Sequence, residues 1–110
     1  MSKFEVSFCG LKDALKHNAV RIQVVLGVMA IIGGLIIHLD YYEWLAFVIC
    51  IGMVITVEIV NTAIEKIGDY LNPEYDDKVK VIKDISSGAV LACSIMALVV
   101  CIMCVLRRIV

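Results

Sequence analysis

The sequence has little proline, little glycine and no excess of positive charge. One proline and seven glycines among 110 residues exclude a collagen-like chain and a flexible linker. Ten basic and eleven acidic residues give a net charge of −1, so the basic surface typical of nucleic-acid-binding domains is absent. The P-loop, Gly-x-Gly-x-x-Gly and His-Glu-x-x-His motifs are also absent.

The five cysteines do not have the arrangement of a disulfide framework. Four lie inside apolar runs, and only Cys9 lies elsewhere. Cys101 and Cys104 form a Cys-x-x-Cys, but no turn or further ligand flanks it, whereas redox and zinc sites need polar access and more ligands. We interpret these cysteines as small apolar side chains.

Apolar residues dominate the chain. They make up 62% of it, charged residues make up 19%, and the mean hydropathy is +0.97, whereas soluble domains are about 45–50% apolar. Three apolar stretches, residues 22–39, 44–64 and 89–106, approach the roughly 20 residues that cross a bilayer as a helix. We therefore predict a one-domain, all-α membrane protein with three spans over residues 1–110. The first stretch begins too late for a cleaved signal peptide.

The residues before the first span have an amphipathic pattern. Phe4, Phe8, Leu11 and Leu15 recur at helical spacing, with lysines between them. This pattern predicts a helix over residues 3–17 that lies in the membrane surface. An amphipathic helix packed on the other spans has the same pattern, and both can hold.

Lysine and arginine positions predict the topology. The N-terminal arm and the connection 65–84 each carry four of these residues, and the connection 38–43 carries none. The N-terminus and the second connection are therefore expected in the cytoplasm and the first connection outside. Arg107 and Arg108 then lie outside, against the rule. Tyr41, Tyr42 and Trp44 would form the outer aromatic belt.

Ionisable residues within a span are costly and mark functional sites. Glu58, Asn61, Glu65 and Asp69 in the second span form what we call the polar stripe. At 100° per residue, Glu65 and Asp69 lie about 20° to either side of Glu58, and Asn61 about 60° away. Aligned carboxylates repel one another, and a bound cation or a proton relieves this. Such oxygen ligands suit Mg²⁺, which often also binds substrate phosphates.

The helix that leads into the third span offers a second row of polar residues: Lys80, Lys83, Asp84 and Ser87. The two lysines could provide positive charge for a phosphate. Simpler interpretations remain open, because Asp69 and Glu74 could be solvated charges and Asn61 could hydrogen-bond a neighbouring helix. Glu58 taken alone fits a proton-coupled transporter equally well.

These motifs resemble one family. The run from Glu58 to Asp69, then Pro73-Glu74-Tyr75, then the run from Lys83 to Leu91 closely resemble the prokaryotic diacylglycerol kinases, which include undecaprenol kinases. The resemblance covers nearly the whole chain. It implies a homotrimeric lipid kinase of the bacterial inner membrane that uses ATP and Mg²⁺ to phosphorylate a lipid alcohol at the cytoplasmic interface.

The resemblance also implies roles for individual residues. Glu58 would be the general base with Asn61 beside it, and Ser87 would lie near the lipid. Glu65 would bind both the metal and the nucleotide. The remaining nucleotide-binding residues would be Asp69, Glu74, Lys83 and Asp84. Close helix contacts between subunits are expected at Ala30-x-x-x-Gly34 and Gly52-x-x-x-Thr56.

The chain departs from the family at the end of the surface helix. The family usually has a metal-binding glutamate there, whereas this chain has His17 or Asn18 at that place. Asn18 offers a neutral oxygen, so weaker metal binding is expected. The sequence Asn-Thr-Ala-Ile-Glu-Lys at residues 61–66 favours undecaprenol as the acceptor, with diacylglycerol as the second choice. A non-enzymatic transporter or scaffold is the alternative, and it would need an acidic group near mid-membrane and no nucleotide-binding residues.

Overall fold

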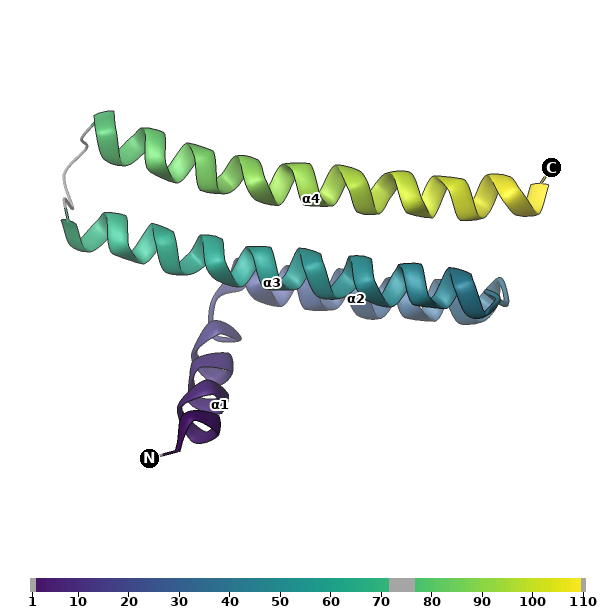
Figure 1. The fold of residues 1–110 in the computed structure, drawn as a ribbon, viewed down its shortest axis with the longest axis horizontal. Coiled ribbons are helices and arrows are strands. Elements are labelled where there is room, and N and C mark those ends of the chain that lie inside the picture. Colours follow the sequence, from purple (N-terminus) through teal and green to yellow (C-terminus); the bar gives the residue numbers. More distant parts are fainter. Residues whose placement is uncertain (1, 72–76, 110) are drawn as a thin grey trace.

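The computed structural model describes residues 2–71 and 77–109, and it is built of helices (Figure 1). The helices are α1 (Lys3–Ala14), α2 (Asn18–Ile36), α3 (Tyr41–Leu71) and α4 (Asp77–Ile109). α2, α3 and α4 are each long and apolar enough to cross a membrane. This confirms the predicted all-α membrane protein with one short N-terminal helix and three spans.

Helix ends differ from the predicted segments where the backbone turns. The N-terminal helix ends at Ala14 rather than residue 17, and α2 begins at Asn18 because His17 is extended, with φ −88° and ψ 134°. α2 ends at Ile36 rather than residue 39 because His38 has φ 56°, a left-handed conformation through which a helix does not continue. α3 and α4 run well beyond the predicted spans, so their outer turns are polar.

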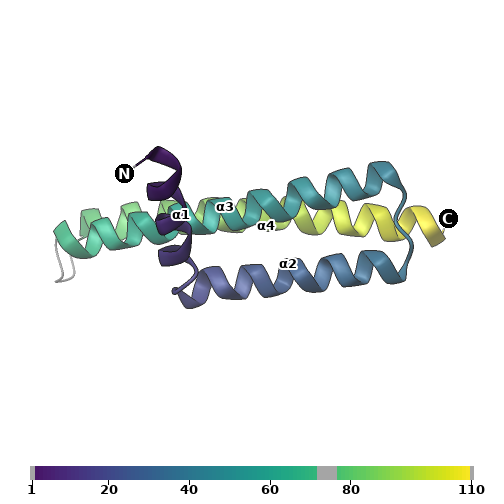
Figure 2. The same cartoon turned by 90° about the horizontal axis from the view of Figure 1, so that it is seen from below.

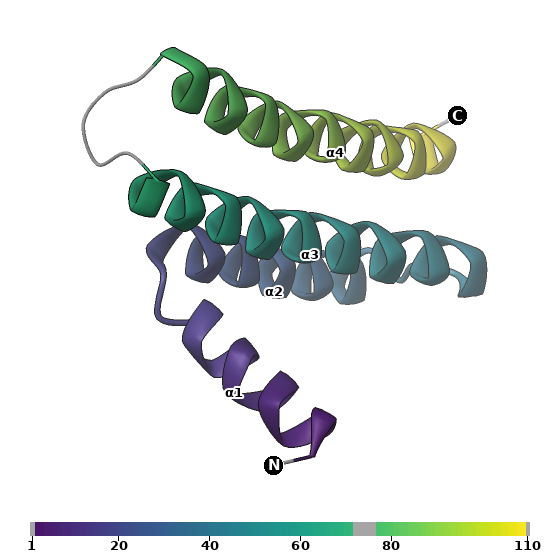
Figure 3. The same cartoon turned by 60° about the vertical axis from the view of Figure 1, so that its left-hand side comes forward.

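α1 projects away from the other three helices (Figures 1 and 3). It begins after Ser2, whose hydroxyl oxygen accepts a hydrogen bond of 3.2 Å from the backbone N–H of Glu5, the usual N-cap arrangement. Phe4 and Phe8 on its apolar side are 79% and 65% exposed. An unpacked apolar side suits the membrane interface, and this placement stays a prediction.

α3 packs against both α2 and α4, as Figures 1 and 2 show. Gly34 of α2 permits a close approach, because a Cβ there would lie 2.7 Å from Cδ1 of Leu39 and 2.9 Å from Cη2 of Trp44. Gly34, predicted for contacts between subunits, is therefore used within the chain. Gly52, the other predicted glycine, has open space where a Cβ would lie, so that face stays available to a second copy.

Large apolar side chains on the three long helices mostly face outward. Leu26, Val48 and Leu98, one on each helix, are more than half exposed. Such exposure is unfavourable in water but costs nothing against lipid tails, which are equally apolar. All five cysteines are free thiols, and Cys93 and Cys104 are buried.

The connection between α2 and α3 ends in a reciprocal cap. The Glu43 backbone N–H donates to Oδ1 of Asp40 over 2.9 Å, and the Asp40 backbone N–H donates to Oε1 of Glu43 over 3.1 Å. This is a capping box at the start of α3. The Glu43 N–H, and after it the Arg107 guanidinium, hold the pKa of Asp40 below its usual range, although partial desolvation opposes them.

The last turn of α4 is joined to this connection by ion pairs. Arg108 donates to Oε1 of the buried Glu43 over 2.6 Å and to the His38 carbonyl over 2.8 Å. Arg107 lies 3.0 Å from Oδ2 of Asp40. We call Asp40, Glu43, Arg107 and Arg108 the C-terminal ion cluster. The two arginines that oppose the topology rule are thus paired with carboxylates rather than isolated.

Candidate functional site

The polar stripe begins where the membrane-crossing part of the bundle ends. At about 1.5 Å per residue, the 19 residues of α2 span about 28 Å, whereas the 31 of α3 and 33 of α4 span about 46 and 50 Å. α3 and α4 therefore continue as a pair past the start of α2 (Figure 1). Glu58 lies about 26 Å from the first residue of α3, close to the edge of a hydrocarbon core about 30 Å thick.

The half of the stripe nearer the membrane is buried and hydrogen-bonded. Glu58 and Asn61 are 6% and 5% exposed, and Glu65 is half-buried. The Asn61 amide donates from Nδ2 to Oε1 of Glu65 over 3.3 Å and accepts at Oδ1 from the Ser86 hydroxyl over 2.6 Å. The Thr62 hydroxyl donates to the Glu58 carbonyl of its own helix over 2.9 Å. Asn61 therefore bridges the stripe to α4.

The other half of the stripe is open to solvent. Lys83 of α4 donates from Nζ to Oδ1 of Asp69 over 2.5 Å, and the two side chains are 34% and 67% exposed. Gly68 makes room for this pair, because a Cβ there would lie 2.9 Å from Cε of Lys83 and 3.1 Å from Cγ1 of Val79. A lysine is thus placed beside the carboxylates, on the neighbouring helix.

The rest of the predicted row on α4 faces outward. Lys80 and Asp84 form an ion pair of 2.5 Å one turn apart, with side chains 48% and 61% exposed. Ser87 is also exposed, and the adjacent Ser86 is the serine that faces α3. Of this row, Lys83 pairs with a stripe residue, Asp69.

His17 and Asn18, predicted as metal ligands, make no hydrogen bond or ion pair with the stripe among the described residues. Glu74 lies outside the described residues. His17 precedes α2 and makes no side-chain capping bond, and Asn18 is exposed in the first turn. A 2.7 Å bond from Nε of Arg21 to the Leu15 carbonyl holds the turn between α1 and α2. The metal-binding role of His17 or Asn18 stays a prediction.

The donor set suits a metal that arrives with its substrate. Within residues 2–71 and 77–109, no group of three or more His, Cys, Asp or Glu side chains could by itself hold an ion. Glu58 and Glu65 are about 10 Å apart along the helix axis. Mg²⁺ commonly uses one or two carboxylates together with phosphates and water. Glu65 together with the phosphates of a bound nucleotide would fit that pattern.

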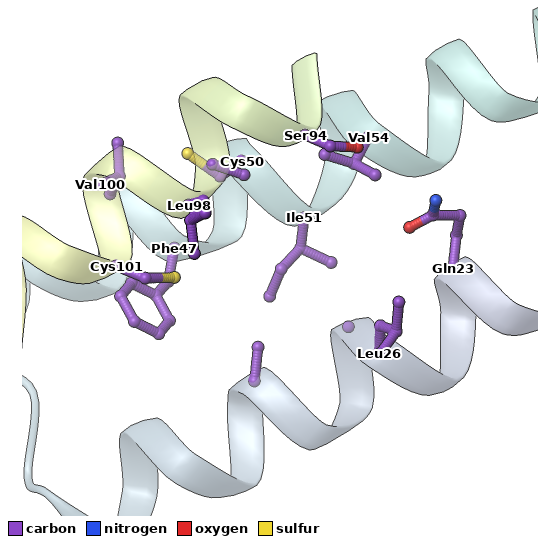
Figure 4. Close-up of a pocket in the computed structure, with 13 residues that line it drawn as sticks. Gln23, Leu26, Phe47, Cys50, Ile51, Val54, Ser94, Leu98, Val100 and Cys101 are labelled. Carbon is purple, nitrogen blue, oxygen red and sulfur yellow. The ribbon is translucent and has the colours of Figure 1, made fainter. Parts of the chain in front are cut away.

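An apolar cavity of about 390 Å³ lies between α2, α3 and α4. Figure 4 shows Leu26 and Ile51 pointing toward it from facing helices, with Gln23 and Ser94 at one end. Val54 also lines that end, one helical turn before Glu58. The cavity therefore lies in the membrane-crossing part of the bundle, and its lining on α3 ends one turn before the polar stripe.

Sequence reasoning missed Ser86. It assigned the polar face of α4 to Ser87, one residue further on. Ser86 lies seven residues before Cys93, and both are buried, so they share one face of α4. The period of the buried positions on α4 was the signal that could have separated the two serines.

Comparison with known proteins gives the same family as the motifs. The sequence profile described as prokaryotic diacylglycerol kinase matches residues 5–105. A diacylglycerol kinase of Sinorhizobium sp is 32% identical over 91 residues, which is 83% of this chain. A diacylglycerol kinase of Helicobacter pylori is 31% identical over 73% of the chain, and an undecaprenol kinase of Bacillus subtilis is 29% identical over 64%.

The chain spans only part of these relatives. The matched stretches cover 66%, 63% and 57% of their lengths, respectively. The profile nevertheless covers nearly all of this chain, including α1, the three spans, the polar stripe and Lys83. The chain therefore belongs to the prokaryotic diacylglycerol kinase family.

Proposed function

We propose that this chain is a lipid kinase that transfers the γ-phosphate of ATP to the hydroxyl of a membrane lipid. The observation that carries this proposal is the position of Glu58. It is buried one turn beyond the apolar cavity and begins a stripe that ends at the exposed pair of Asp69 and Lys83. A lipid alcohol entering from the membrane and a nucleotide entering from water would meet there. The relatives named as lipid kinases support the same reaction class.

Glu58 would act as the general base. Its carboxylate would accept the proton of the lipid hydroxyl as that oxygen bonds to the γ-phosphorus. The bond from phosphorus to the β-γ bridging oxygen breaks, and ADP leaves. Phosphoryl transfer needs positioning and charge neutralisation more than covalent help, and a positioned base typically contributes 10²–10⁴-fold. Asn61 beside Glu58 would hold the stripe in place through its bonds to Glu65 and Ser86.

The nucleotide would lie against the solvent-exposed end. Lys83 would exchange part of its contact with Asp69 for a phosphate oxygen, since its ammonium has three donors. Glu65 would hold Mg²⁺ on the phosphates, where the ion supplies charge neutralisation. The remaining nucleotide-binding residues in this proposal are Asp69, Glu74 and Asp84.

The apolar cavity suits the hydrocarbon of the lipid. Its lining is nearly all apolar, and its end at Val54 lies one turn from the base. Ser87 would contact the acceptor lipid from the exposed face of α4. We favour undecaprenol as the acceptor because of the sequence Asn-Thr-Ala-Ile-Glu-Lys at residues 61–66, with diacylglycerol as the second choice. The relatives carry both names at nearly equal identity.

The proposal includes a homotrimer in the bacterial inner membrane. The N-terminus and the connection between α3 and α4 would be cytoplasmic, and the C-terminus would be outside. The face of α3 around Gly52 is open for a second copy. A proton-linked transporter fits less well, because residues 44–57 and 85–106 contain no acidic residue.

Labelled ATP tests the proposal directly. The purified protein in liposomes would be given γ-labelled ATP with Mg²⁺ and either undecaprenol or diacylglycerol, and lipids would be separated by thin-layer chromatography. Labelled lipid is expected with at least one acceptor, and more with undecaprenol. Absence of ATP-dependent label with both lipids, in protein that remains folded, would overturn the assignment.

A further inference from the structure

Among the described residues, the Ser86 hydroxyl joins α4 to the buried half of the stripe on α3. Its hydroxyl lies 2.6 Å from Oδ1 of Asn61, and the two residues are 8% and 5% exposed. The bond joins positions 25 residues apart in the sequence. No role follows for Ser86 from the family motif, which directs attention to Ser87.

The direction of this bond is fixed by chemistry. Asn61 donates from Nδ2 to Oε1 of Glu65 over 3.3 Å, which is the pairing expected for an ionised carboxylate, because that group can only accept. Oδ1 of Asn61 then faces Ser86 and can also only accept. The Ser86 hydroxyl must therefore donate, and the chain of donors runs from Ser86 through Asn61 to Glu65.

Reversal of the Asn61 amide would remove the hydrogen-bond donor that faces Glu65. With the amide turned by 180°, its carbonyl oxygen would face a carboxylate oxygen, and two acceptors would oppose each other. The Ser86 hydroxyl disfavours that state because it donates a hydrogen bond to the Asn61 carbonyl only when this carbonyl points toward α4. Without Ser86 the carbonyl is buried with one fewer donor, which is the costly outcome for a polar group away from water.

We infer that Ser86 is a positioning residue that holds the Asn61 amide toward Glu65 and so keeps Glu65 oriented for its metal-nucleotide ligand. The inference rests on the proposed function of Glu65. The N–H that Asn61 donates to Oε1 of Glu65 fixes the orientation of that carboxylate. Groups that orient a metal ligand typically change metal affinity by about 10–100-fold when removed. Ser86 acts one bond further out, so we expect about a threefold to tenfold effect.

The test uses Ser86→Ala and Ser86→Thr in the full-length protein. Ser86→Ala removes the donor, and Ser86→Thr keeps a hydroxyl. The first measurement is the binding of Mn²⁺ in the presence of a non-hydrolysable ATP analogue. The free ion is quantified by electron paramagnetic resonance. Ser86→Ala should raise the dissociation constant about threefold to tenfold, and Ser86→Thr should stay within about twofold of the parent. Ser7→Ala, which removes an exposed hydroxyl bonded to the Lys3 carbonyl of α1, is the matched control and should change nothing.

Kinetics separate positioning from packing. Ser86→Ala should raise the Mg²⁺ concentration for half-maximal rate by the same factor while the apparent KM for lipid stays constant. Equal weakening by the alanine and threonine variants would show a packing effect and overturn the inference, as would an unchanged Mn²⁺ affinity in Ser86→Ala. If the parent protein itself binds no Mn²⁺–nucleotide, the proposed function fails instead, so the two failures are distinguishable.

Discussion

The two ends of the α3–α4 pair use charge in opposite ways. In the C-terminal ion cluster, Asp40 and Glu43 cap α3 and also pair with Arg107 and Arg108. In the polar stripe, three carboxylates share one helix face, and the ion pair recorded there is the exposed one between Asp69 and Lys83. The first arrangement neutralises its charges and joins helices. The second concentrates negative charge, which costs stability and is typical of functional sites.

Replacement of the proposed general base, Glu58, should give the largest difference between the polar stripe and the C-terminal ion cluster. Glu58→Gln keeps the shape of the side chain but cannot accept a proton, so phosphoryl transfer should fall by about 10²–10⁴-fold while the protein stays assembled. Glu43→Gln is the matched control at the other end, and it should lower thermal stability but retain transfer. Initial rates and melting curves in detergent measure both. More than about a tenth of the parent rate in Glu58→Gln would contradict its role as base.

Changes at the exposed end of the stripe should affect the nucleotide. Lys83→Ala and Glu65→Ala each remove a charged partner of MgATP, so the apparent KM for ATP should rise, kcat should fall, or both, with a combined loss of roughly 10–100-fold. ATP titration at fixed lipid and lipid titration at fixed ATP distinguish the substrates. An effect confined to the lipid titration would contradict the assignment.

Disruption of the C-terminal ion cluster should weaken the fold and leave the chemistry intact. Arg108→Ala leaves the buried Glu43 without its 2.6 Å partner, so we expect a loss of about 2 kcal/mol in the free energy of unfolding. Arg107→Ala should cost less, because its pair with Asp40 is largely exposed. Thermal unfolding in detergent, with activity per folded molecule, tests this. A large fall in specific activity with unchanged stability would show that the two ends are not separate.

A carboxylate at the junction of α1 and α2 should strengthen the metal site. Asn18→Glu, or His17→Glu if the alignment gap falls one residue earlier, adds one negative charge near Mg²⁺. The Mg²⁺ concentration for half-maximal rate, expected in the millimolar range for the parent chain, should fall about twofold to fivefold. A Mg²⁺ titration at saturating ATP and lipid measures it. Unchanged midpoints in both variants would show that this junction faces the lipid headgroups instead.

The smallest effect concerns pH. The pKa of Asp40 is lowered in the folded chain, so its stabilising contribution is present above the unfolded pKa of about 3.9 and is lost as the pH falls through the lower folded pKa. The melting temperature of the parent should therefore exceed that of Asp40→Asn at pH 6, and the gap should shrink toward pH 3. A gap that does not change with pH would exclude this linkage.

The polar stripe could be predicted because the alignment of its residues depends on the period of one helix alone. Glu58, Glu65 and Asp69 lie on one face by the helical period, and α3 carries them as expected. Contacts between helices could not be predicted in this way. The bond from Ser86 to Asn61 and the pair of Arg108 with Glu43 join residues 25 and 65 positions apart, and each depends on the rotation and offset of two packed helices. The sequence pattern constrains neither quantity to within one residue, so the contact of Ser86 with Asn61 was not predicted.

Helix ends show the same limit. Hydropathy predicts where a span is apolar but not where its backbone turns, so the left-handed conformation of His38 shortened α2 relative to its apolar stretch. The sequence left open whether the polar ends of α3 and α4 are helical or belong to the connection between them. Gly68 permits their close packing, because its lack of a side chain makes room for Lys83.

The pairs made by Arg107 and Arg108 bear on how the chain enters its membrane. In the proposed topology these two arginines must be translocated to the outer side, and an arginine at the centre of a spanning helix costs about 2.5–3.5 kcal/mol on insertion scales. Asp40 and Glu43 belong to a hairpin that is synthesised earlier, so it can already present two carboxylates outside when the last helix is released from the ribosome. In that topology the order of synthesis would supply the arginines with partners on arrival. A chain with Asp40 and Glu43 both neutralised would leave the final helix prone to insertion with its arginines in the cytoplasm.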